Sequence, residues 1–157
     1  MATIVNRVMN ALDQKDIMYR VIEHREDFTA QETAEDTFTP GDQFAKAVVL
    51  EADGELLMAV VAAPEHVDLR KIGMALNATD VALINEDRML DLFPDCEIGA
   101  EPPFGNLYDM PVYVSPTIAD DDYITFNGGS HIHVLRMRYQ DYEMLVKPQV
   151  IDMVLDN

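Results

Sequence analysis

A single lysine stands in the middle of an apolar segment, FAKAVVL, at residues 44 to 50. Side chains alternate between the two faces of a strand, so Lys46 is expected to share a face with Phe44, Val48 and Leu50. Burying an ammonium group costs several kcal/mol unless an anionic or polar partner meets it. Lys46 therefore either lies at a sheet edge with its charge in water or meets an anionic ligand.

A second candidate is the loop GAEPPFG, at residues 99 to 105. Gly99 and Gly105 permit unusual backbone angles, whereas Pro102 and Pro103 are stiff. Such loops can present backbone N–H and C=O groups to a ligand. Judged alone, the segment fits a rigid connector better than a binding loop.

A third candidate is FNGGSHIH, at residues 126 to 133, where Gly128-Gly129 separates two apolar strands. The glycines fit a hairpin turn, and they also allow a ligand to approach the backbone closely. His131 and His133 are expected to project from the same strand face, a spacing that some metal sites use. Because nothing in the spacing brings a third ligand, such as His24 or His66, to them, metal binding is the less favoured interpretation.

Several other chemistries lack their sequence signatures. The triplet Asp120-Asp121-Asp122 lacks the spaced oxygen ligands of a calcium-binding loop and fits a solvated turn. The chain has no G-x-S-x-G elbow, no P-loop and no dinucleotide fingerprint. Cys96 is the one cysteine, which excludes an internal disulfide and a cysteine-based zinc site. A reducing cytoplasm is the expected location.

The charge of the chain is far from neutral, with 29 acidic and 11 basic residues and a net charge of −18. This favours a solvated acidic surface and works against binding a polyanion, because neutralising phosphates requires lysine and arginine. No apolar run approaches the roughly 18 residues of a membrane span. The polar Asn6, Arg7 and Asn10 within the first apolar pattern indicate an amphipathic helix and not a signal peptide.

The elements that must position these residues follow from periodicity and from turn signals. We expect one domain, 1–157, of the α+β class, built on a mixed, barrel-like sheet that short helices surround. Thr29 and Glu32 form a capping box, and Asp53-Gly54 predicts a hairpin. The predicted helices are 2–14, 29–36, 67–77, 85–93 and 139–147, and the predicted strands are 17–24, 44–52, 55–63, 80–84, 111–116, 122–127 and 131–138.

In this order, the motifs resemble the YbaK-like family, which comprises editing domains associated with prolyl-tRNA synthetase and their free-standing relatives. The resemblance runs from about residue 17 to 147. It rests on Glu23-His24 at a strand end, the TAQETAED helix, the lysine strand FAKAVVL, the G-x-x-x-P loop from Gly99 to Pro103, and FNGGS before the last strand. Each motif is weak alone, and their common order over most of the chain carries the resemblance.

The resemblance implies a trans-editing hydrolase that removes a wrong amino acid from tRNA by attack of a positioned water on the ester, without a metal or other cofactor. It places Lys46 near the phosphate or ribose of the terminal nucleotide, and it gives catalytic roles to Gly99, Pro103 and His133. The residues implied to bind substrate are Phe44, Phe104, Asn127, Gly128, Gly129, Ser130 and His131. We therefore expect Lys46 to line a concave pocket close to both glycine loops.

The implied partners are the acceptor end of an aminoacyl-tRNA and an aminoacyl-tRNA synthetase, with no membrane. Two alternatives stay open at this stage. One is a catalytically inactive module of the same fold that binds a small ligand, a nucleotide or a protein. The other is a metal hydrolase that uses His131 and His133. The sequence does not indicate the amino acid, the tRNA or the oligomeric state.

Overall fold

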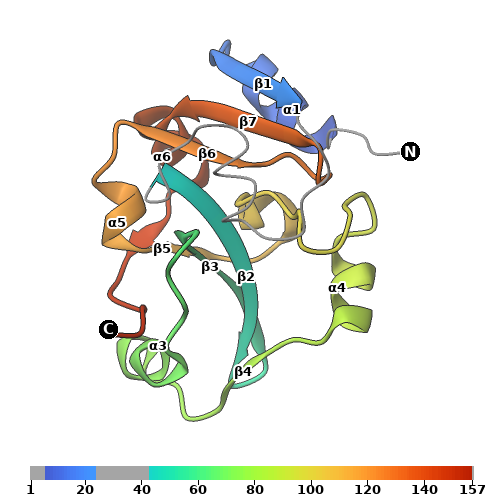
Figure 1. The fold of residues 1–157 in the computed structure, drawn as a ribbon. Coiled ribbons are helices and arrows are strands. Elements are labelled where there is room, and N and C mark those ends of the chain that lie inside the picture. The colour runs from blue at the N-terminus through green and yellow to red at the C-terminus, as the bar shows by residue number, and fades with distance from the viewer. Residues whose placement is uncertain (1–5, 24–42, 157) are drawn as a thin grey trace.

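The computed structural model of the chain describes residues 6–23 and 43–156 (Figure 1). The predicted helix 29–36 and His24 lie outside these residues. The helical elements are α1 (Asn6–Gln14), α3 (Leu69–Leu76), α4 (Glu86–Leu92), the 3-10 helix η2 (Gly105–Tyr108), α5 (Pro116–Ala119) and α6 (Tyr139–Val146). The strands are β1 (Tyr19–Glu23), β2 (Phe44–Ala52), β3 (Glu55–Ala62), β4 (Val81–Leu83), β5 (Val112–Val114), β6 (Tyr123–Asn127), β7 (His133–Arg138) and β8 (Gln149–Val150).

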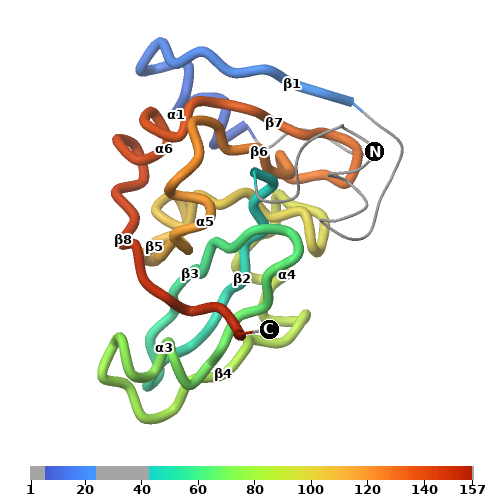
Figure 2. Tube along the Cα trace, turned by 60° about the vertical axis from the view of Figure 1, so that its left-hand side comes forward, coloured from blue at the N-terminus to red at the C-terminus, as the bar shows by residue number. Residues whose placement is uncertain are grey.

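Within the described residues, all strands belong to one eight-stranded sheet in the order β1-β7-β6-β2-β3-β5-β8, with β4 paired to β2. The β1–β7, β6–β7, β2–β3 and β2–β4 pairs are antiparallel, whereas β2–β6, β3–β5 and β5–β8 are parallel. Figure 2 shows the curved path from β1 and β7 at the top to β3 and β5 below. The mixed α+β architecture predicted from the sequence is confirmed, and this path is not closed into a complete barrel.

The centre of the sheet is the β2–β3 hairpin. Asp53 and Gly54 both have positive φ, at 49° and 86°, as the tight turn between the strands requires. The register runs from Ala45 opposite Ala62 to Ala52 opposite Glu55. The Asp-Gly signal and the two apolar runs therefore predicted this element correctly.

The two faces of β2 bury different clusters. Ala45 and Val49 point into the main core, which also contains Phe104, Phe126 and Tyr142. On the other face, Leu50 packs with Ile72 of α3. Helices α3 and α4 accordingly lie on opposite sides of the hairpin (Figure 1). The predicted alternation of the FAKAVVL segment is confirmed.

Phe44 belongs to a third, small cluster with Ala63 and Val134, against which Ile22 packs. Lys46 is two residues further along β2, so it lies on this same outer face, between the small cluster and the part covered by α3. Its side chain is half-buried. The strand thus holds its lysine away from the main core.

The helix ends follow local capping chemistry. The Asp68 carboxylate accepts hydrogen bonds from the backbone N–H groups of Arg70 and Lys71, and the Asn85 side chain accepts from that of Arg88. Both residues lie at the start of the helices that the sequence predicts over 67–77 and 85–93, and both are of types that favour this position. No helix within the described residues is long and apolar enough to cross a membrane.

The structure differs from the expected elements in three places. Pro116 begins the short helix α5, where the sequence predicts the end of a strand. The pair of residues in β8 was missed, because a strand of two residues has no detectable period. The last long strand begins at His133 and leaves His131 in the preceding turn.

Gly105 is packed too closely against its neighbours to accept an added methyl group without a shift. A Cβ there would lie 2.9 Å from atoms of Met110 and Val112 and 3.1 Å from Cβ of Met58. We expect Gly105→Ala to lower the free energy of unfolding by about 1–3 kcal/mol, through overpacking. Urea denaturation measures this, with Met74→Ala, at an exposed helix position, as the control that stays within about 0.5 kcal/mol of wild type. Equal stability of Gly105→Ala and wild type would contradict the packing described here.

Candidate functional site

The two glycine loops are joined to each other by backbone hydrogen bonds. Glu97 N–H donates to the Gly129 carbonyl over 2.8 Å, and Gly129 N–H donates to the Ala100 carbonyl over 3.0 Å. These loops are some 30 residues apart in the sequence, and they form one unit in the fold. The structure therefore brings together the second and third candidate segments.

His131 adds two contacts to this unit. Its backbone N–H donates to Oε1 of Glu97 over 2.6 Å, and its Nε2 lies 2.6 Å from the Ile98 carbonyl oxygen. The imidazole also covers Gly99, where a Cβ would lie 3.4 Å from Cε1 of His131. Gly99 has a φ of +85°, a conformation that favours glycine. His131 thus holds the two loops together.

The amide groups of the glycine residues are occupied within the protein. Gly99 N–H donates to the Glu101 carboxylate, at 2.9 Å from Oε2, and Gly128 N–H donates to the His133 carbonyl. Burial raises the pKa of Glu101, and the Gly99 amide opposes that shift. Because Gly129 N–H is also bonded, the groups that these glycines can offer to a ligand are their carbonyl oxygens.

The far end of the G-x-x-x-P loop is fixed to α6. The Tyr142 hydroxyl donates to the Pro103 carbonyl over 2.6 Å, and Tyr142 is fully buried. The next residue, Phe104, packs between Phe126 and Tyr142 at ring-centroid distances of 5.4 Å. Phe104 is therefore a main-core residue on the opposite side of the sheet from Lys46, and its contact with substrate stays a prediction.

Ser130, His133 and Glu23 form a chain of hydrogen bonds. Ser130 Oγ lies 2.8 Å from Nδ1 of His133, and Nε2 of His133 lies 3.0 Å from Oε1 of Glu23. Ile132 N–H also donates to Ser130 Oγ, over 3.3 Å. Ser130 and His133 are buried, whereas the side chain of Glu23 is 74% exposed. Both ring nitrogens of His133 therefore have a hydrogen-bond partner, and one of these partners, Glu23, lies at the protein surface.

The histidines do not form the metal-binding pair that the sequence allowed. His131 lies in the turn and contacts the 97–99 segment, whereas His133 lies on β7 and contacts Ser130 and Glu23. Across residues 6–23 and 43–156, no group of three or more His, Cys, Asp or Glu side chains is arranged to hold a metal ion. Burial raises the pKa of Cys96 to about 12, so its thiol is not an activated nucleophile near neutral pH.

The Lys46 ammonium donates a hydrogen bond to the Ala63 carbonyl over 3.1 Å. Burial lowers the pKa of Lys46, and the negative charge of Glu65 partly opposes this shift. The Glu65 carboxylate is itself held by three donors, which are the Ala62 N–H, the Ser115 hydroxyl and the Thr117 hydroxyl, at 2.8, 2.9 and 2.7 Å. A fixed carboxylate therefore lies near the lysine.

Sequence reasoning missed Glu65 as a residue of this site. Its two hydroxyl partners come from the α5 segment, 50 and 52 residues away. No local spacing connects these positions, and only the parallel pairing of β3 with β5 brings them together. The structure thus gives Lys46 a charged neighbour that the sequence pattern does not indicate.

Strand register places the glycine turn beside the lysine strand. In the parallel β2–β6 pair, Phe44 lies opposite Thr125 and Ala45 lies opposite Phe126. Lys46 and Asn127 come next on their strands, so both project from the outer face at the same level. Asn127 is 7% exposed, and its Oδ1 is buried with no hydrogen-bond partner among residues 6–23 and 43–156. The Lys46 ammonium itself contacts Ala63, so its predicted closeness to both loops stays a prediction.

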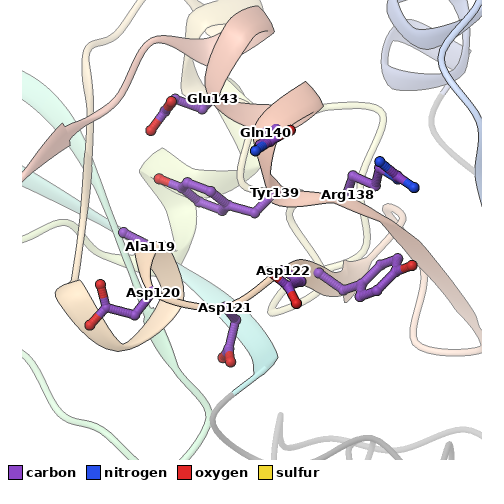
Figure 3. Close-up of a pocket in the computed structure, with 9 residues that line it drawn as sticks. Ala119, Asp120, Asp121, Asp122, Arg138, Tyr139, Gln140 and Glu143 are labelled. Carbon is purple, nitrogen blue, oxygen red and sulfur yellow. The ribbon is translucent and has the colours of Figure 1, made fainter.

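The cavity in Figure 3 is a separate feature, of about 490 Å³, between α5 and the start of α6. Its charged lining consists of Asp120, Asp121, Asp122, Glu143 and Arg138. None of the residues predicted to act on substrate lines it. The excess of carboxylates makes it unsuitable for a phosphate-bearing ligand.

One sequence family matches most of the chain, and solved structures share its fold. The sequence model of a family described as the aminoacyl-tRNA editing domain matches residues 24–145. No curated protein sequence matches the chain. A crystal structure of a candidate trans-editing enzyme for prolyl tRNA synthetase has a TM-score of 0.83 and 21% identity, over 96% of each chain. A protein from work on epitope backbone grafting onto scaffold proteins has a TM-score of 0.84 and 21% identity, over 97% of each chain.

The Tyr142–Pro103 hydrogen bond can be tested by removing one oxygen atom. We expect Tyr142→Phe to destabilise the protein by about 1–3 kcal/mol, because it leaves a buried carbonyl without its donor. Urea denaturation measures the loss, and amide hydrogen exchange should show faster exchange at Gly99 and Ala100. Tyr123→Phe, which removes a hydroxyl from an exposed side chain, is the matched control. An unchanged stability and an unchanged exchange rate in Tyr142→Phe would contradict this role.

The electrostatic environment of Lys46 can be tested by NMR titration of the lysine Cε resonances. We expect Lys46 to titrate below its ordinary value of 10.5, because burial disfavours the ammonium form. Glu65→Gln should lower the pKa of Lys46 further, because it removes the charge that opposes the burial effect. Glu55→Gln, at the far end of β3, should leave it unchanged. If the pKa of Lys46 is the same in Glu65→Gln as in wild type, the two groups do not interact electrostatically.

Proposed function

The chain belongs to the family of aminoacyl-tRNA editing domains, and from this premise we propose that it hydrolyses the ester bond of mischarged aminoacyl-tRNA in trans. The observation that carries the proposal is the joined pair of glycine loops beside the lysine strand. Family membership supports editing of aminoacyl-tRNA. The reaction and the residue roles below are our inference from the geometry.

The reaction requires little from the protein beyond positioning. The oxygen of a water molecule attacks the ester carbonyl carbon, the bond to the ribose oxygen breaks, and that oxygen leaves with a proton. An aminoacyl ester is already labile, so holding the water and the carbonyl in line supplies much of the rate enhancement. This is why a site without an activated nucleophile is sufficient for the proposed chemistry.

We propose that the two joined loops, residues 97–100 and 128–131, bind the aminoacyl group; we call them the glycine unit. Its amide groups donate within the protein, so we assign the carbonyls of Gly99 and Gly128 as acceptors for the attacking water or the α-ammonium group. Pro103 holds the end of the loop through Tyr142. His131 and Glu97 keep the two loops at a fixed separation. The glycine unit therefore acts through preorganised backbone groups and not through an acid or a base.

We assign Lys46 to the phosphate or ribose of the terminal nucleotide. A half-buried ammonium whose contacts are a carbonyl and a nearby carboxylate can strengthen its interactions by meeting an anionic ligand. Phe44 and Asn127 share its face and are assigned to the same nucleotide. His133, with both nitrogens engaged, is assigned to positioning Ser130 and the glycine turn.

The test is a panel of mischarged tRNAs incubated with the purified protein, with loss of the ester followed over time. We expect cleavage of at least one substrate, a loss of about 10²-fold or more in kcat/KM for Lys46→Ala, and no loss on treatment with a chelator. Lys15→Ala, which removes an exposed lysine of the α1 end, is the control that keeps full activity.

Each result has a defined meaning. If the protein cleaves no aminoacyl-tRNA faster than buffer does, the enzyme proposal is wrong and the non-catalytic binding module replaces it. If Lys46→Ala cleaves like wild type, the role of the lysine is wrong. If the chelator abolishes cleavage, the metal-independent mechanism is wrong.

A further inference from the structure

The proposed function does not use the acidic cavity between α5 and the start of α6 (Figure 3). We propose that this cavity is a binding site for a linear polyamine, a flexible chain that carries two or more ammonium groups. None of the residues assigned to the editing reaction lines the cavity. The inference therefore goes beyond the proposed function and does not depend on it.

The lining is rich in carboxylates, which are hydrogen-bond acceptors with a negative charge. Asp120, Asp121 and Asp122 follow α5, and Glu143 lies one turn into α6. The guanidinium of the lining belongs to Arg138, and Figure 3 shows it directed away from Asp120 and Asp121. Carboxylates gathered in this way repel one another, so a cation bound among them lowers the electrostatic free energy of the region.

A buried hydroxyl group distinguishes this cavity from an ordinary acidic surface. Tyr139, which lines the cavity, is 4% exposed, and its hydroxyl has no hydrogen-bond partner among residues 6–23 and 43–156. Most buried polar groups in folded proteins are hydrogen-bonded, so an unpaired one requires an explanation. Figure 3 shows the Tyr139 ring between α5 and α6, with its hydroxyl on the side of Ala119 and Glu143. A ligand that donates a hydrogen bond in the cavity would pair this group.

The chemical state of Tyr139 suits a cationic ligand. Burial raises the pKa of Tyr139 to about 12, and the negative charge of Glu143 acts in the same direction. The side chain is therefore a neutral hydroxyl near pH 7, and its oxygen can accept a hydrogen bond from an ammonium group. The ring of Tyr123 also lines the cavity, and aromatic faces attract ammonium groups.

The lining discriminates between classes of ligand. Across residues 6–23 and 43–156, no group of three or more His, Cys, Asp or Glu side chains is arranged to hold a metal ion. The carboxylates of the cavity therefore do not converge on one point, as a metal ion would require. Phosphates and free amino acids carry an anionic group that the carboxylates repel. A polyamine has its charges spaced along a chain, so each ammonium group can meet a different carboxylate.

The size and the rigidity of the cavity fit a small molecule. Its volume of about 490 Å³ lies within the range of small-molecule sites. Tyr139 N–H donates to the Asp122 carbonyl over 2.9 Å, which joins the start of α6 to the segment after α5. Asp120 N–H and Asp121 N–H donate to the carbonyls of Pro116 and Ile118, at 2.9 and 3.2 Å. Because the walls are held by the protein's own backbone, a ligand does not have to order them.

The experiment measures binding of spermidine by isothermal titration calorimetry at low ionic strength. Tyr139→Phe removes the hydroxyl without a change of charge. Asp120→Asn with Glu143→Gln neutralises two exposed carboxylates of the cavity, and Asp91→Asn with Glu55→Gln neutralises two exposed carboxylates elsewhere. Both double variants change the net charge from −18 to −16.

We expect the Kd for spermidine to rise about tenfold in Tyr139→Phe, because a hydrogen bond to a charged group is lost. The Kd should rise about fivefold or more in the cavity double variant, through the loss of two exposed ion pairs. It should change less than about twofold in the control double variant. Spermidine should also shift the backbone amide NMR resonances of Asp120, Asp122 and Gln140, and Mg²⁺ at equal ionic strength should not.

Four results would overturn the proposal. The first is the absence of spermidine binding to wild type. The second is an equal loss of affinity in the two double variants, which would show that total charge and not this cavity controls binding. The third is wild-type affinity in Tyr139→Phe, because the unpaired hydroxyl would then have no ligand. The fourth is the same resonance shifts with Mg²⁺ as with spermidine. Circular dichroism of each variant establishes that it is folded.

Discussion

The pairing of the 97–100 segment with Gly129 is the constraint on which the candidate site depends. Two backbone hydrogen bonds, Glu97 to Gly129 and Gly129 to Ala100, convert two distant loops into one rigid unit. Positive φ at Gly99 and Gly129, 85° and 95°, lets the chain follow this path without a clashing side chain. Backbone groups in such a unit keep their positions when a ligand arrives, which is the condition for catalysis by positioning.

The sheet positions the lysine strand next to the glycine turn. Its parallel β2–β6 pairing carries the lysine strand alongside the strand that ends at the glycine turn. One face of β2 is buried in the main core, so the lysine is confined to the other face, where an ammonium can meet a ligand. Glu65, held by Ser115 and Thr117, limits the electrostatic cost of keeping that charge half-buried.

Local chemistry made much of the fold predictable. The hairpin followed from Asp53-Gly54 and two apolar runs, and the predicted helices 67–77 and 85–93 are present, with their starts capped by Asp68 and Asn85. The site was predictable only in part. The glycine loops were identified by composition, but the placement of Phe104 in the core and the different partners of His131 and His133 depend on tertiary packing. Glu65 and Tyr142 contact the site across large separations in sequence, for which no local pattern exists.

The most direct measurement of the central claim is a structure of the protein bound to an amide-linked, non-hydrolysable analogue of aminoacyl-adenosine 5′-phosphate. The account predicts that the aminoacyl group lies against Gly99 and the Gly128–Ser130 turn, and that the Lys46 ammonium contacts the phosphate or the ribose. It also predicts that the glycine unit keeps the hydrogen bonds it has in the free protein. An analogue bound in the acidic cavity, or bound away from Lys46, would contradict the account.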